Sequence, residues 1–260
     1  MKTFRMIGMA LVAVVLGFAM SSCENDDNVD PYKDYPQLVV GKWFNFTPTE
    51  SVFMNFNDDK TVSTVGLNRQ VIVVDAGHGG MDGGGVGVDG ILEKDLNLQI
   101  AKKLENLLTE KGYSVVMTRT EDVSLHEEGK NTVREQKNSD LKQRAFVANE
   151  QKAGLFISIH MNKFESPDVK GAQVFFKKED TKGAEYAKNI MNSLKKFDTE
   201  NHRQEKVLPN KNLTFSKLNV PAVLVECGFI SHQEETKKLQ EDAYQDALVQ
   251  AIFDGITATP

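Results

Sequence analysis

Three segments of the chain carry polar side chains that could do chemistry, and each belongs to a run of apolar residues. His78 follows VIVVDAG, His160 closes LFISIH, and Glu226 lies inside AVLVECGF. Unbroken runs rich in Val and Ile are typical of strands buried on both faces of a parallel sheet. Ligands of such sheets bind beyond the carboxyl ends of the strands. We therefore expect these three side chains to meet at one edge of a sheet.

Glu93 is a fourth candidate, because it opens an amphipathic segment directly after a glycine-rich stretch. A carboxylate in a first helical turn is also favoured by the helix dipole alone. The glycines before Glu93 would let the helix start fold back onto His78. Two histidines and a carboxylate with an open position are the donor set of a catalytic zinc site, whereas a structural site closes its fourth position with a protein ligand. The sequence thus predicts one Zn²⁺ per chain, with His78 as its first ligand.

Glu226 is the candidate for proton transfer. A carboxylate among apolar residues is costly to bury unless it has a partner or a function. Pairing with a lysine is the alternative, and the surrounding apolar residues favour the functional interpretation. The adjacent Cys227 should point to the opposite face of the strand, where we expect it to pack in the core.

Three further residues could support the site or the substrate. Asp75 could orient a metal-binding histidine or cap its own loop. Arg144 could hold a peptide carboxylate or pair with an acid on its helix face. Asn162 is a candidate for the substrate groove.

The elements that must position these residues alternate between strand and helix. Apolar runs predict strands and 3.6-residue periodicity predicts helices. Such alternation indicates an α/β fold of three layers with a mostly parallel sheet. The expected strands are 71–74, 113–118, 155–160, 171–176 and 222–227, and the expected helices are 93–111, 141–151, 181–196, 232–239 and 242–255.

The N-terminus has the features of a secretory signal, assigned to residues 1–22. Lys2 and Arg5 precede an apolar run over 6–20, and two serines and Cys23 follow. The run is shorter than the ~20 residues that span a bilayer. Small residues before a cysteine resemble a bacterial lipobox, which predicts that Cys23 is lipidated. We therefore expect a lipid-anchored protein of the cell envelope, on the outer membrane and facing the periplasm or the cell surface.

Two segments separate the signal from the main domain. Residues 23–37 are acidic and poor in apolar side chains, which is typical of a disordered tether. Residues 38–68 alternate polar and apolar around Asn-Asp-Asp-Lys, which predicts a small β-hairpin appendage. The predicted catalytic domain is 69–257.

Composition excludes some partners. The 260 residues carry a formal net charge of −6 and contain two cysteines. The sign of the charge and the absence of a long basic block argue against nucleic acid. Two cysteines, one of them the predicted lipid site, exclude a disulfide framework. We expect a monomer.

The motifs together resemble a known family. DAGHGGMDGG, Glu93, SIHMN and PAVLVECGFISH occur in the order and spacing of the zinc-dependent N-acetylmuramoyl-L-alanine amidases, the amidase_3 family. The resemblance implies zinc bound by His78, Glu93 and His160, and Glu226 as the catalytic carboxylate. It also implies a twisted sheet of about six strands. Peptidoglycan would be the substrate, cleaved between N-acetylmuramic acid and L-alanine during cell-wall remodelling or turnover, and an activator protein is a partner that the resemblance leaves open.

Other functions remain as alternatives. A zinc carboxypeptidase acting on the stem peptide would use the same metal site. A non-catalytic lipoprotein that binds the wall would need no metal, and a glycosidase using Glu93 and Glu226 would need no histidines.

Overall fold

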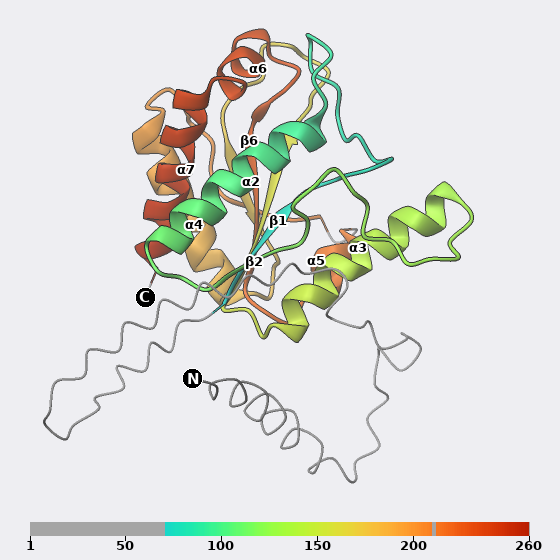
Figure 1. Cartoon of the computed structure of the whole chain (residues 1–260). Helices are drawn as coiled ribbons and strands as arrows, with labels where there is room; N and C mark the ends of the chain where they lie inside the picture. Colours follow the sequence, from blue (N-terminus) through green and yellow to red (C-terminus); the bar gives the residue numbers. More distant parts are fainter. Residues whose placement is uncertain (1–70, 210–211, 260) are drawn as a thin grey trace, which may run out of the picture. The chain divides into compact units, whose positions relative to one another are not determined.

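The computed structural model describes residues 71–209 and 212–259 (Figure 1). The predicted signal peptide, the lipidation of Cys23, the acidic tether and the β-hairpin appendage all lie outside the described residues.

The core of the domain is a six-stranded sheet in the order β2-β1-β3-β6-β4-β5. Strands β2, β1, β3 and β6 are mutually parallel, β4 pairs antiparallel with β6, and β5 pairs parallel with β4. The predicted α/β fold with a mostly parallel sheet of about six strands is therefore confirmed. The strands are β1 Ile72–Ala76, β2 Val115–Met117, β3 Leu155–Asn162, β4 Gln173–Phe176, β5 Lys206–Val207 and β6 Ala222–Phe229.

Helices cover both faces of this sheet and complete the three layers (Figure 1). Side chains of a strand alternate between faces, so Ile72 and Val74 of β1 join one buried cluster and Val73 joins the other. The first cluster contains residues of α2, α4 and α7, and the second contains residues of α3 and α5. The helices are α2 Glu93–Glu110, α3 Val133–Glu150, α4 Thr181–Phe197, α5 Leu213–Lys217, α6 Gln233–Leu239 and α7 Asp242–Thr257.

Helix α3 begins eight residues earlier than the predicted start at 141. Its first two turns are largely exposed, so they show no apolar stripe that periodicity could detect. The signal present in the sequence is a capping box, in which Thr132 and Glu135 satisfy each other's backbone N–H groups. The predicted start was wrong because capping, and not burial, defines this helix end.

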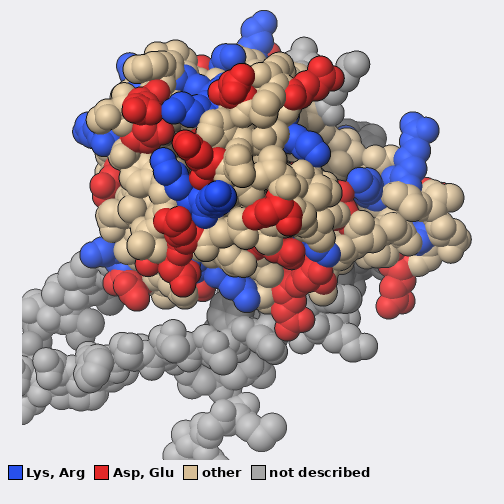
Figure 2. Space-filling view, turned by 90° about the horizontal axis from the view of Figure 1, so that it is seen from above, with Lys and Arg blue, Asp and Glu red and all other residues tan. Residues whose placement is uncertain are grey.

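The carboxyl ends of β1, β3 and β6 and the start of the antiparallel β4 lie at the same edge of the sheet, since β6 is the shared neighbour of β3 and β4. Seen from above, basic and acidic side chains are interspersed on the domain, so this face shows no broad patch of one sign (Figure 2). None of the described helices has the length and apolar character needed to span a bilayer.

Candidate active site

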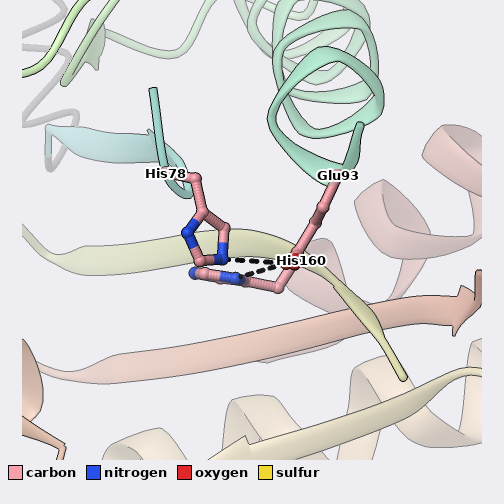
Figure 3. A group of neighbouring side chains, drawn as sticks. All are labelled: His78, Glu93 and His160. Carbon is pink, nitrogen blue, oxygen red and sulfur yellow. Dashed lines mark hydrogen bonds and ion pairs between the residues drawn. The ribbon is translucent and has the colours of Figure 1, made fainter. Parts of the chain in front are cut away.

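His78, Glu93 and His160 converge at this edge of the sheet (Figure 3). The Oε1 atom of Glu93 lies 3.1 Å from Nε2 of His78 and 2.9 Å from Nδ1 of His160. One candidate ligand atom from each side chain falls within 4.8 Å of the other two. Three residues that are distant in sequence thus present two imidazole nitrogens and one carboxylate oxygen to a common point.

The glycine-rich loop returns Glu93 to His78, as the sequence predicted. His78 has a φ of 61° and Gly84 a φ of 69°, both in the left-handed region. The backbone N–H of Gly85 donates to Oε2 of Glu93 at 2.7 Å, and the N–H of Glu93 donates to the carbonyl of Gly85 at 2.9 Å. A Cβ at Gly84 would come within 2.8 Å of the side chains of Glu93 and His78, so glycine is required there.

The register of neighbouring strands explains how His160 and Glu226 come together. His160 of β3 is the register partner of Glu226 of β6. Gly77 occupies the matching place beyond β1, because the residue before it, Ala76, pairs with Ile159. A Cβ at Gly77 would overlap the imidazole of His160. The absence of a side chain at Gly77 therefore gives the His160 ring its place.

Glu226 has the environment of a proton-transfer group. Its Oε2 atom is buried and has no hydrogen-bond partner among the described residues. Burial, followed by the charge of Glu93, raises the pKa of Glu226 to about 7 against the opposing effect of His160 and His78. A carboxyl group of this pKa can both accept and release a proton near neutral pH.

The ionisation of Glu93 differs from that of Glu226. Burial opposes its charge, but hydrogen bonds from His160 and His78 outweigh burial and hold the pKa of Glu93 well below its usual range. Its two histidine neighbours therefore favour the ionised form of Glu93. That state suits a metal ligand.

Asp82 contacts His78 and was missed in the sequence. Its Oδ2 lies 2.9 Å from Nδ1 of His78. In the sequence GHGGMD, His78 and Asp82 are four residues apart, and this spacing could have suggested the contact. Only the geometry of the turn shows that the carboxylate of Asp82 reaches the ring of His78.

Asp75 does not contact a histidine ring and instead holds Arg144. Burial opposes ionisation of Asp75, but Arg144 and the hydroxyls of Ser158 and Thr118 outweigh it, so the pKa of Asp75 lies below its usual range. The NH1 atom of Arg144 is 2.7 Å from Asp75, and its Nε is 2.7 Å from Asp140. Asp75 thus fits neither of the two interpretations, because its partners are Arg144, Ser158 and Thr118 rather than a histidine ring or its own loop.

Arg144 is almost fully buried, with 2% of its surface exposed, so it is not placed to bind a peptide carboxylate. It pairs with Asp140 on its own helix, the second of the two interpretations, and also donates to the carbonyls of Ala76 and His78 at 2.8 and 2.6 Å. It therefore fixes the backbone around His78.

Arg119 and Asn97 were not predicted and add to this support. The Nε of Arg119 donates to the carbonyl of Ala76 at 2.9 Å, and its NH2 donates to Gly77 at 3.0 Å. The amide of Asn97 donates to the same Gly77 carbonyl at 3.1 Å. Three buried side chains, one from α2, one from α3 and one from the segment after β2, thus order the loop that carries the first histidine.

Asn162 ends β3 close to the cluster. Its side-chain oxygen accepts a hydrogen bond from the backbone N–H of Lys163 at 2.8 Å, and it remains partly exposed. This placement is compatible with the predicted groove role. Cys227 is buried in the core, and burial raises the pKa of its thiol, so it is not a nucleophile.

The sequence of this domain matches a known family over almost its whole length. The family Amidase_3, described as N-acetylmuramoyl-L-alanine amidase, matches residues 72–258. The chain belongs to this family.

Relatives of the amidase family agree in sequence and in structure. The germination-specific N-acetylmuramoyl-L-alanine amidase of Bacillus subtilis is 35% identical over 77% of this chain and 84% of its own length. The amidase LytC of the same organism is 30% identical over 79% of this chain, which spans 40% of that longer protein. The CwlD amidase of Clostridioides difficile, solved in complex with the GerS lipoprotein, has a TM-score of 0.70 and 38% identity over 74% of this chain and 98% of its own.

Family membership identifies the reaction. This amidase hydrolyses the amide between N-acetylmuramic acid and L-alanine in peptidoglycan and acts in cell-wall remodelling. The prediction of an enzyme that acts on this bond is confirmed.

Proposed function

We propose that the amidase works with a zinc ion bound by His78, Glu93 and His160 and with Glu226 as general base. The observation that carries the proposal is the convergence of three ligand atoms within 4.8 Å beside a buried carboxylate oxygen of Glu226, which has no hydrogen-bond partner in the part of the chain that the structure describes.

The donor set fits zinc. Two imidazole nitrogens and one carboxylate oxygen are the ligands of catalytic zinc sites, which keep one position open. Softer thiolate ligands are absent from the cluster, and its oxygen ligands are too few for calcium or magnesium. A zinc ion bound there would supply Lewis acidity toward the scissile carbonyl and lower the pKa of water to about 7.

The chain's own residues supply the proton transfers. Glu226, in its ionised form, takes a proton from the attacking water and delivers it to the amine of L-alanine as the amide bond breaks. Its register partner His160 keeps it beside the cluster. Arg144 and Arg119 hold the loop of His78 so that this ligand does not move during the reaction.

Zinc binding is tested by metal analysis of the purified chain. We expect about one zinc per chain, because a site with three protein ligands binds one ion. His160→Ala should lose it. His126→Ala is the matched control and should retain zinc, since His126 contacts Ser124 and lies outside the cluster. Equal zinc content in the two variants would exclude His160 as a ligand.

We also propose that the amidase is a monomeric lipoprotein of the cell envelope, anchored by Cys23. Support comes from the sequence alone: a signal of 22 residues, the lipobox-like residues before Cys23 and the acidic stretch after it. Metabolic labelling with a fatty acid should mark the wild type, and Cys23→Ser should remain unlabelled and soluble. Labelling of the variant would exclude this anchor.

A further inference from the structure

The two ring nitrogens of His78 face different partners. Nε2 faces Glu93 at 3.1 Å, whereas Nδ1 faces Oδ2 of Asp82 at 2.9 Å. A metal bound at Nε2 would leave the only proton of the neutral ring on Nδ1, where the carboxylate of Asp82 can accept a hydrogen bond from it. The lone pair of Nε2 is then directed at the cluster, which is the form that binds a metal.

Asp82 is itself fixed at the backbone. Reciprocal hydrogen bonds of 3.0 and 3.1 Å join it to Gly79 across a tight turn. Gly80 within the turn has a φ of 57°, which an L side chain rarely adopts. The turn therefore sets the distance between the carboxylate and the His78 ring.

The second oxygen of Asp82 is held from a distant part of the chain. Nζ of Lys137 donates to Oδ1 of Asp82 at 2.9 Å. Lys137 lies in the exposed first part of α3, 55 residues after Asp82. His160 has a different arrangement, because its ring is placed by packing over Gly77.

We propose that Asp82 is the positioning residue of His78 and that Lys137 holds Asp82 in place, so that the exposed start of α3 contributes to zinc affinity. This inference rests on the proposed zinc site. It concerns the orientation of one ligand and not the chemistry of the reaction.

The alternative is an ordinary surface ion pair. The side chains of Lys137 and Asp82 are 49% and 29% exposed. Such pairs contribute about 0–1 kcal/mol to folding. Both interpretations therefore predict nearly unchanged unfolding of zinc-free Lys137→Met, and only the positioning role predicts weaker zinc binding.

The test measures zinc affinity of the full chain by competition with a chromophoric chelator. Loss of the carboxylate in Asp82→Ala should weaken zinc binding by about 10- to 100-fold, the range observed when such outer partners are removed. Lys137→Met should weaken it less, by roughly threefold to tenfold, and Lys137→Arg should restore it. Lys142→Met is the matched control on the exposed side of the same helix and should match the wild type.

A second measurement addresses the ring directly. Long-range ¹H–¹⁵N spectra of the zinc-loaded wild type should show the His78 proton on Nδ1. Asp82→Asn keeps a hydrogen-bond acceptor without the charge. It should preserve this tautomer and retain more zinc affinity than Asp82→Ala, which keeps the inference testable if the alanine variant does not fold.

The outcomes separate the two proposals. A wild type that binds no zinc overturns the zinc site and this inference together. Zinc binding by Asp82→Ala equal to that of the wild type, or a His78 proton on Nε2, overturns only the positioning role. Lys137→Met indistinguishable from Lys142→Met overturns the contribution of α3.

Discussion

Glu226→Gln is expected to lower kcat/KM on peptidoglycan by about 10²- to 10⁴-fold while leaving zinc bound. Glutamine has the size of glutamate but cannot accept a proton, so proton removal from water is lost. The ligand set of His78, Glu93 and His160 is unaffected because Glu226 is not part of it. Release of soluble wall fragments and metal analysis of the same sample measure both quantities.

The free energy of unfolding distinguishes this effect from misfolding. Burial raises the pKa of Glu226, so ionisation costs more in the folded state than in the unfolded state. That cost is present above pH 7 and disappears as the pH falls through the folded pKa. Glu226→Gln should therefore be at least as stable as the wild type at pH 8, and Glu179→Gln, at an exposed position, should change neither stability nor activity. Full activity of Glu226→Gln would remove this residue from the mechanism.

Arg144→Met is expected to destabilise the domain by about 3–5 kcal/mol, because removal of one partner leaves a buried charge uncompensated. Arg144 is the shared partner of Asp75 and Asp140, both buried, and it also binds the carbonyls of Ala76 and His78. Denaturant unfolding of the zinc-free chain measures the change. Arg134→Met is the control on the exposed start of α3 and should stay within about 0.5 kcal/mol of the wild type.

The pKa of Asp75 determines how the destabilisation caused by Arg144→Met changes with pH. The pKa of Asp75 is lowered in the folded wild type, so its contribution to stability is present above its usual range near 3.8 and is lost as the pH falls through the lower folded value. Without Arg144, burial dominates and the pKa of Asp75 rises. The difference in the free energy of unfolding between the variant and the wild type should therefore become smaller at acidic pH. A destabilisation below 1 kcal/mol at pH 7 would contradict the role of Arg144.

The sequence predicted the parts of the site that depend on local pattern. Apolar runs located β1, β3 and β6, and parallel pairing then required His160 and Glu226 to meet at one edge. Glycines after His78 indicated a loop able to return Glu93, and the structure contains that loop.

Most of the contacts that the sequence did not predict join distant segments. Arg144 reaches Asp75 across 69 positions, and Lys137 reaches Asp82 across 55, so no local spacing reports either pair. The role of Gly77 follows only from its register beside His160. Such contacts arise when distant segments pack together in the fold. They leave no periodic pattern of apolar and polar residues in a single sequence.

The most direct test of the account is digestion of purified sacculi by the purified chain, with products identified by mass spectrometry. We predict new α-amines of L-alanine together with intact glycan strands, loss of these products with a chelator, and their return when zinc is added. Release that persists with a chelator would contradict the zinc mechanism. Shortened stem peptides or new reducing sugar ends in place of free L-alanine amines would contradict the assigned bond.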